Sequence, residues 1–96
     1  MEPDNIIHQP VRLKIMSALK GSGAEPLEFT RLKAIVDATD GNLGSHLATL
    51  ETAGYIVIEK DFVGKKPRTR VALSKAGRVA FEKHVLYLRA ILDGAD

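Results

Sequence analysis

Hydrophobic residues recur at helical spacing in several separate stretches of this 96-residue chain. Apolar residues three and four positions apart lie on one face of a helix, whereas alternate apolar residues lie on one face of a strand. Val11, Ile15 and Leu19 share one face. They predict a first helix over about residues 10–20, with Pro10 in its first turn, where the missing N–H is no loss.

Two further helices are predicted over about residues 30–36 and 40–53. The inward stripe of the later helix consists of three leucines: Leu43, Leu47 and Leu50. Either Thr39 or Asp40 can accept hydrogen bonds from the free N–H groups at its start. Gly54 follows its last turn, where a left-handed backbone conformation costs glycine least. The pattern therefore predicts a helix with a sharp beginning and end.

The outer side of the helix over residues 40–53 carries only small and polar side chains: Gly41, Asn42, Ser45, Ala48, Thr49 and Thr52. The major groove of DNA, about 12 Å wide, admits a helix whose exposed side chains are short or can bond to base edges. We therefore predict that Asn42, Ser45 and Thr49 read bases. Gly41 and Gly44 each cost a helix about 1 kcal/mol relative to alanine. Close backbone approach to DNA and simple tolerance near a helix start are both open explanations.

A β-hairpin is predicted after this helix. Residues 55–61 are rich in β-branched side chains, and residues 69–73 alternate between apolar and polar positions. The segment between them, residues 62–68, contains Gly64 and Pro67 and is expected to form the tip. A short extended segment over residues 27–29 is expected to pair with this hairpin.

The last predicted helix, over about residues 74–92, carries two apolar lines. The first consists of Phe81, Val85, Leu88 and Leu92, and the second consists of Val79, Leu86 and Ala90. A surface helix of a small domain normally buries one stripe, so a second stripe indicates a second partner. We predict a homodimer paired partly through Phe81, Val85, Leu88 and Leu92, with Leu13 of the first helix contributing. The alternative is a helix wedged deep within its own domain.

Positive charge is concentrated in one part of the chain. The net charge is only +2, but seven lysine and arginine residues stand against Asp61 alone between Lys60 and Arg78. Such a patch suits a polyanion, because neutralising phosphates releases condensed counterions. The residues expected to contact the DNA backbone are those of the wing: Lys65, Lys66, Arg68 and Arg70. An arginine at a wing tip can also enter a narrow minor groove. The alternative is a solvated, lysine-rich loop.

The same sequence argues against several other functions. With no cysteine, disulfides, thiolate metal sites and cysteine nucleophiles are excluded. The three histidines, His8, His46 and His84, are far apart in the sequence, so we expect no metal site, cofactor or enzymatic activity. We expect His46 to make a structural hydrogen bond or a phosphate contact, His8 to lie at the start of the first helix, and His84 to be solvated. No apolar run approaches the ~18 residues that span a bilayer, so we expect a soluble, cytoplasmic, nucleoid-associated protein.

This order of elements predicts a mainly α chain with a small β-hairpin (α+β). Residues 1–96 are expected to form a single winged helix-turn-helix domain with a recognition helix (40–53), a wing (55–73) and a long C-terminal dimerisation helix (74–92). Segments 8–16, 45–56 and 73–78 resemble the corresponding parts of ArsR-type and MarR-type transcription regulators, in the same order. The chain is most similar to the short prokaryotic members of that group.

The resemblance implies a sequence-specific regulator that binds double-stranded DNA as a homodimer on a pseudo-palindromic operator. The chain lacks the cysteines of the metal-sensing relatives, and at this length it has little material for a pocket, so no small-molecule effector is expected. Two other functions remain open: a winged-helix protein-interaction module and a nucleic-acid-binding protein without sequence preference. A protein-docking helix would more often display aromatic anchors on its outer side.

Overall fold

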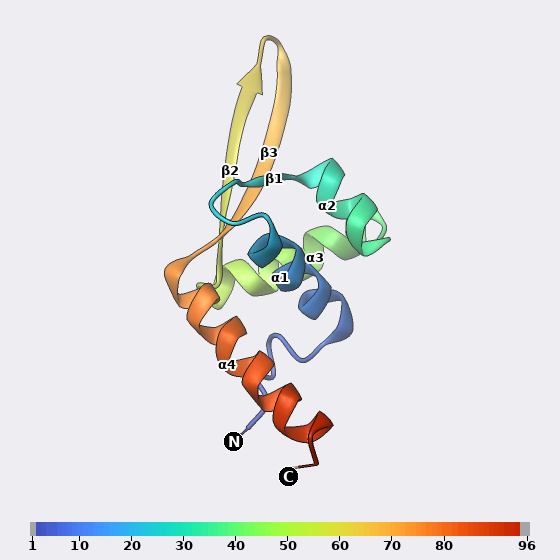
Figure 1. Ribbon diagram of the computed structural model, residues 1–96. Helices are drawn as coiled ribbons and strands as arrows, with labels where there is room; N and C mark the ends of the chain where they lie inside the picture. Colours follow the sequence, from blue (N-terminus) through green and yellow to red (C-terminus); the bar gives the residue numbers. More distant parts are fainter. Residues whose placement is uncertain (1, 95–96) are drawn as a thin grey trace.

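The computed structural model describes residues 2–94, which form four helices and three strands in the predicted order (Figure 1). The elements are α1 (Pro10–Gly21), β1 (Leu27–Glu28), α2 (Phe29–Val36), α3 (Asp40–Thr52), β2 (Ile56–Val63), β3 (Lys66–Leu73) and α4 (Lys75–Leu92). The helix-turn-helix pair, the hairpin and the long last helix are therefore confirmed. The short segment expected to be extended over residues 27–29 stops one residue earlier, because Phe29 begins α2.

Side chains cap the starts of α3 and α4. The Thr39 hydroxyl accepts a hydrogen bond from the Asn42 N–H at 3.1 Å, so Thr39 rather than Asp40 is the cap of α3. The Ser74 hydroxyl accepts from the Gly77 N–H at 2.9 Å in the same way. Each such cap satisfies an N–H group that would otherwise lack a partner within the helix, which contributes about 1 kcal/mol.

A residue with a left-handed backbone conformation lies on each side of α3, one in the turn before it and one just after its end. Asp37, in the turn between α2 and α3, has a φ of 54°, a conformation that aspartate adopts more readily than most residues. Gly54 has a φ of 81° and ends α3, as the sequence predicts. The chain then enters β2 within two residues, so α3 is tied directly to the hairpin.

The hairpin is longer and its turn tighter than the sequence predicts. Its strands reach Val63 and Lys66, and only Gly64 and Lys65 lie between them. Gly64 has a φ of 63°, which is the conformation that a two-residue turn of type II′ requires at its first central position. The prediction of a loop over residues 62–68 is therefore wrong.

Pro67 lies within β3, opposite Phe62. In a two-residue hairpin the pair next to the turn is hydrogen-bonded, so the following pair is not. The N–H that proline lacks would therefore point to the outer edge of the ribbon, and no ladder bond is lost. Pro67 therefore fits within the strand, although a proline at this position in the sequence indicates a loop.

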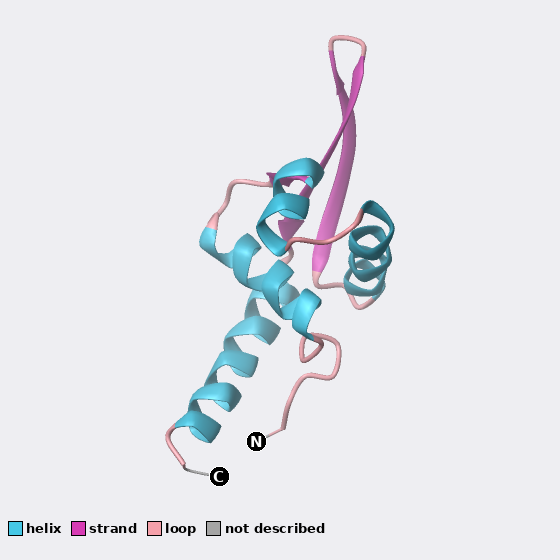
Figure 2. Ribbon diagram, turned by 90° about the vertical axis from the view of Figure 1, so that its right-hand side faces the viewer, coloured by secondary structure: helices cyan, strands magenta, loops and turns pink. Residues whose placement is uncertain are grey.

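The three strands form one antiparallel sheet in the order β1-β3-β2. Strand β1 pairs with β3 only at Leu27↔Val71 and Glu28↔Arg70, so four further rows of β2 and β3 form a free two-stranded ribbon. At about 3.3 Å per residue this ribbon extends roughly 13 Å beyond the three-stranded part. Both views show it projecting from the body, and the longest dimension of the molecule is 53 Å against 25 and 21 Å (Figures 1 and 2).

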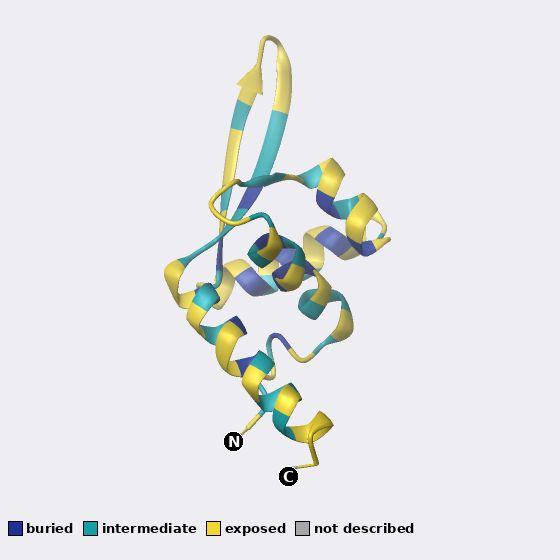
Figure 3. Cartoon of the chain, viewed as in Figure 1, coloured by how far each residue is buried: buried dark blue, intermediate teal, exposed yellow. Residues whose placement is uncertain are grey.

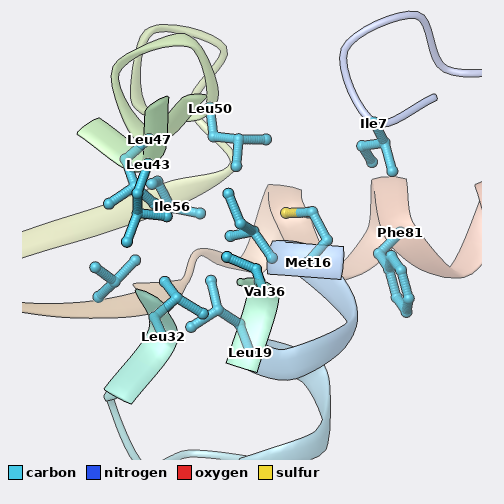
Figure 4. Close-up of a cluster of buried hydrophobic side chains, with 12 residues drawn as sticks. Ile7, Met16, Leu19, Leu32, Val36, Leu43, Leu47, Leu50, Ile56 and Phe81 are labelled. Carbon is cyan, nitrogen blue, oxygen red and sulfur yellow. The ribbon is translucent and has the colours of Figure 1, made fainter. Parts of the chain in front are cut away.

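The hydrophobic core lies between α1, α2, α3 and the base of the sheet, and Ile7 of the N-terminal segment and Phe81 of α4 extend it (Figure 4). Its buried residues are Ile7, Ile15, Met16, Leu19, Leu32, Val36, Leu43, Leu47, Leu50, Ile56, Val71 and Phe81. Full burial of one such side chain stabilises a fold by about 1.5–3 kcal/mol. All three leucines of the predicted α3 stripe belong to this core, so the orientation of α3 about its own axis is set by its inner side.

The beginning of α4 is clamped to the end of α3. The Ser74 hydroxyl donates to the Gly54 carbonyl oxygen at 2.6 Å, and the Ser74 N–H donates to the Tyr55 carbonyl oxygen at 3.0 Å. Gly77 is buried against the same peptide: a Cβ there would lie 2.8 Å from the Tyr55 carbonyl carbon and closer still to its oxygen. Only glycine fits this joint without movement of the backbone.

The N-terminal segment runs under α4 and buries a histidine. His84 is only 1% exposed, so the prediction that it is solvated is wrong. Its Nδ1 accepts a hydrogen bond from the Asp4 N–H at 3.2 Å, and the His8 ring stands edge-on with its centroid 5.5 Å away. The same Asp4 accepts from the Tyr55 hydroxyl at 2.6 Å, which raises the pKa of Tyr55 to about 12. Burial lowers the pKa of His84.

Within residues 2–94, no helix combines the length and the apolar character needed to cross a lipid bilayer.

Candidate nucleic-acid interface

The outer side of α3 is open to solvent. Its exposed residues are Gly41, Asn42, Gly44, Ser45, Ala48 and Thr52, while Thr49 is half-buried (Figure 3). The leucines on the opposite side are buried, so none of these positions is needed for packing. The arrangement presents short hydrogen-bonding groups on a helix whose back is anchored in the core.

The side chains on this surface differ in how free they are. The Thr49 hydroxyl donates to the Ser45 carbonyl oxygen at 3.3 Å, one turn back along the helix. It therefore keeps its lone pairs and its methyl group for a ligand, but its proton is engaged. Asn42 and Ser45 have exposed side chains. An asparagine amide carries donors and an acceptor, and a serine hydroxyl can serve as either. Asn42 and Ser45 are the freer pair of the three predicted base-reading residues.

The two glycines of α3 have no packing role inside the chain. A Cβ built at Gly41 or Gly44 would meet no heavy atom within 4 Å. This contrasts with Gly77, where the backbone of Tyr55 occupies the space. The space in front of Gly41 and Gly44 is open, so another molecule can come close to the backbone of α3 there. This is compatible with the explanation that the two glycines allow close approach to DNA.

His46 is held by a residue of α1. Its Nδ1 lies 3.1 Å from Arg12 Nη1, and the Arg12 Nε–H also donates to the Ile6 carbonyl oxygen. Because a guanidinium can only donate, Nδ1 must be the acceptor and the ring proton sits on Nε2. Burial and the neighbouring Arg12 charge lower the pKa of His46. His46 thus makes a structural hydrogen bond that links α3 to α1, and its Nε2–H remains a donor.

Two of the four wing cations form ion pairs with carboxylates of β2. Arg68 forms two parallel hydrogen bonds with Asp61 at 2.9 and 2.7 Å, and Arg70 reaches Glu59 at 3.2 Å and Asp61 at 3.4 Å. The bond from Arg68 also holds the pKa of Asp61 below its usual range. Arg68 and Arg70 are therefore already paired in the free chain.

The lysines of the ribbon are arranged differently. Lys60, Lys65 and Lys66 are exposed, and none of them forms an ion pair within the described part of the chain. The Glu59 and Asp61 carboxylates could have been found from the sequence only with the register in hand, since they lie opposite Arg70 and Arg68. The free positive charge is thus concentrated nearer the turn than the sequence suggests.

The residues predicted for a dimer interface are spread between core and surface. Phe81 belongs to the chain's own core, and Leu13 and Val85 pack against that core. Leu88 is half-buried, whereas Leu92 is 83% exposed. The second apolar line of α4 is open instead, with Val79 and Leu86 about half exposed at 47% and 54%. The first line is thus a packing face at its start and a free surface only at its end.

Comparisons with known proteins agree with this architecture. A family model described as a winged helix DNA-binding domain matches residues 11–92. An uncharacterised protein of Methanocaldococcus jannaschii is 36% identical over 80 residues, which cover 83% of this chain and 85% of that protein.

Two solved structures resemble the chain as well. One is a transcriptional regulator homologue from Pyrococcus horikoshii OT3, with a TM-score of 0.85 and 32% identity over 97% of this chain and 90% of that one. The other is a MarR-family transcriptional regulator from Silicibacter pomeroyi, with a TM-score of 0.74 and 20% identity over 95% of this chain and 59% of that one. The second likeness concerns the fold alone.

Proposed function

This chain belongs to the winged helix DNA-binding domain family, and from that premise we propose that it is a transcription regulator that binds specific duplex DNA sites as a homodimer. In this proposal α3 lies in the major groove, and the ribbon of β2 and β3 rests on the neighbouring backbone or minor groove. The relative from Pyrococcus horikoshii, itself described as a transcriptional regulator homologue, supports the regulatory role.

One observation carries the proposal: the polar side of α3 is exposed while its leucines are buried. Asn42 and Ser45 are assigned to base edges, since asparagine can pair with adenine through two hydrogen bonds and serine can donate or accept. Thr49 offers its methyl group to thymine. Gly41 and Gly44 let the start of α3 approach the DNA closely, and His46 can donate to a phosphate through Nε2.

The ribbon supplies affinity rather than sequence preference. Lys65 and Lys66 are assigned to phosphates, because they are exposed and unpaired within residues 2–94. Arg68 and Arg70 join them only if phosphates compete with the carboxylates of Asp61 and Glu59. Phosphate contacts position a protein on DNA and add to the salt dependence of binding without reading bases.

A second copy of the chain completes the proposed regulator. The apolar surface offered to it is the line of α4 that carries Val79 and Leu86, because Leu88 and Leu92 lie about half a turn around the helix, on its other side. Exposed apolar side chains gathered on one element are typical of an interaction site. Dimers of helix-turn-helix proteins bind half-sites about one helical turn, roughly 34 Å, apart, and we expect the same spacing for this chain.

The test is selection of bound sites from a random duplex library at physiological salt. We expect enrichment of a motif with two-fold symmetry and half-sites separated by about one helical turn. Enrichment of a single, asymmetric motif would contradict the dimer. Binding without enrichment would favour a protein that recognises DNA by charge and shape, and no binding at low salt would favour a protein-interaction module.

A further inference from the structure

The two faces of the free ribbon have different chemistry. Residues directly opposite one another in an antiparallel pair share a face, and the face alternates along each strand. One face carries Asp61 and Arg68, which neutralise each other. The other carries Phe62, opposite Pro67, and continues the apolar face that is buried at the base of the sheet. This surface is apolar at its base and again at Phe62 and Pro67, and the row of Lys60 and Thr69 separates the two parts.

Phe62 stands at the exposed end of that surface. It is 69% exposed, and Pro67 is exposed beside it. The pair lies one row before the turn, in the part of the ribbon that β1 does not reach. A large aromatic side chain in this position adds little to the packing of the described chain, so its place on the ribbon is not explained by the fold.

Unpaired lysines surround Phe62. Lys60 precedes it by two positions and shares its face, while Lys65 and Lys66 lie in and just after the turn. All three are exposed, and none is in an ion pair within residues 2–94. An apolar wedge between cations suits a narrow channel with two anionic walls and stacked bases at its floor, because the wedge can insert between base steps. The minor groove of DNA, about 6 Å wide between two phosphate backbones, has this character.

We propose that Phe62, supported by Pro67, inserts into the minor groove of duplex DNA, with Lys60, Lys65 and Lys66 on the flanking phosphates. The inference rests on the proposed function, because α3 in the major groove brings the ribbon to the adjacent minor groove. Those two grooves are about half a helical turn apart, roughly 17 Å, and the ribbon projects roughly 13 Å. Phenylalanine and proline are side chains that wedge against base steps in the minor groove.

The test measures duplex binding by fluorescence anisotropy for the wild-type chain, Phe62→Ala and Val57→Ala. Val57 is a matched control, because it is a half-exposed apolar residue of the same strand at the base of the ribbon, about 17 Å from Phe62. The probe is an A/T-rich duplex three helical turns long at low salt. We expect Phe62→Ala to weaken binding roughly 5- to 100-fold, as loss of an aromatic contact to bases does. Val57→Ala should bind like wild type.

A second arm identifies the groove. A drug that occupies the minor groove should lower the affinity of the wild type to that of Phe62→Ala and leave Phe62→Ala unaffected. Thermal unfolding should show all three proteins equally folded, since both replaced side chains are largely outside the core.

Two results would overturn the assignment of Phe62 and leave DNA binding itself in place. They are an unchanged affinity in Phe62→Ala, and a drug effect of equal size on wild type and variant. A wild-type chain that binds no duplex would instead overturn the proposed function, and this inference with it.

Discussion

Replacing Gly77 by alanine tests the joint between the last helix and the rest of the fold. The added Cβ would lie 2.8 Å from the Tyr55 carbonyl carbon and 3.0 Å from its Cα, and these are backbone atoms that cannot rotate aside. The first turn of α4 would have to move away from β2. That movement would stretch the hydrogen bond from the Ser74 N–H to the Tyr55 carbonyl oxygen, now 3.0 Å long.

The expected change in the free energy of unfolding combines two destabilising effects and one stabilising effect. Overpacking costs about 1–3 kcal/mol, and loss of a hydrogen bond costs about 0.5–1.5 kcal/mol. Alanine returns up to about 1 kcal/mol through helix propensity. Gly77→Ala should therefore lower the free energy of unfolding by about 0.5–4.5 kcal/mol. For a domain of this size, each kcal/mol lowers Tm by about 4–8 °C.

Gly44→Ala is the matched control, because it is the same substitution inside a helix with nothing within 4 Å of the new Cβ. The free energy of unfolding of Gly44→Ala should exceed that of wild type by up to about 1 kcal/mol. Thermal unfolding followed by circular dichroism, at one fixed protein concentration, measures both variants. Equal Tm values for Gly77→Ala and wild type would refute the tight joint. A Tm for Gly44→Ala below that of wild type would refute the open space in front of Gly44.

Three further substitutions test other parts of the account. Asp61→Asn should free Arg68 for a phosphate, so duplex affinity should rise and the salt slope of log K should steepen by about 0.9; an unchanged titration series would show that Arg68 does not reach DNA. Burial holds the pKa of His84 below the usual 6.5, so the unfolded chain takes up more protons as the pH falls and stability should drop between about pH 7 and pH 5. His84→Gln should reduce that drop in Tm, and an equal drop would contradict it. Leu86→Glu should convert a dimer into a monomer in sedimentation equilibrium. A wild-type chain that is already monomeric would contradict the proposed homodimer.

The helices could be predicted from the sequence because their signals are local. The spacing of Leu43, Leu47 and Leu50 sets the inner side of α3, and Thr39 and Gly54 mark its ends. Such signals depend on neighbours within one or two turns of the helix. Tertiary contacts therefore do little to shift the position or the ends of these helices. The exposed outer side of α3 followed from the same periodicity.

The hairpin was harder to predict because its length depends on register. Pro67 suggested a loop, although its position opposite Phe62 needs no N–H in the ladder. Once the two-residue turn at Gly64 is known, the pairing of Asp61 with Arg68 follows directly. Without that register, the sequence predicts that Arg68 and Arg70 are free cations and that Phe62 lies in a loop.

Contacts between distant segments account for the remaining errors. Nothing in the spacing of α4 shows that residues 2–8 lie against His84, since that segment has no periodic pattern. In the same way, the sequence shows two apolar lines on α4 but not which one meets the core. Phe81 proves to be a core residue, and Leu86 remains outside.

The assignment of α3 as the reading helix is tested most directly by comparing Asn42→Ala with Lys65→Ala on two duplexes. One duplex carries the motif obtained by selection, and the other carries the same bases in shuffled order. Asn42→Ala should narrow the difference in binding free energy between the duplexes by about 1–3 kcal/mol. Lys65→Ala should weaken binding to both alike. If Asn42→Ala instead weakened both duplexes equally and left the difference between them unchanged, α3 would not be reading bases and the account would be wrong.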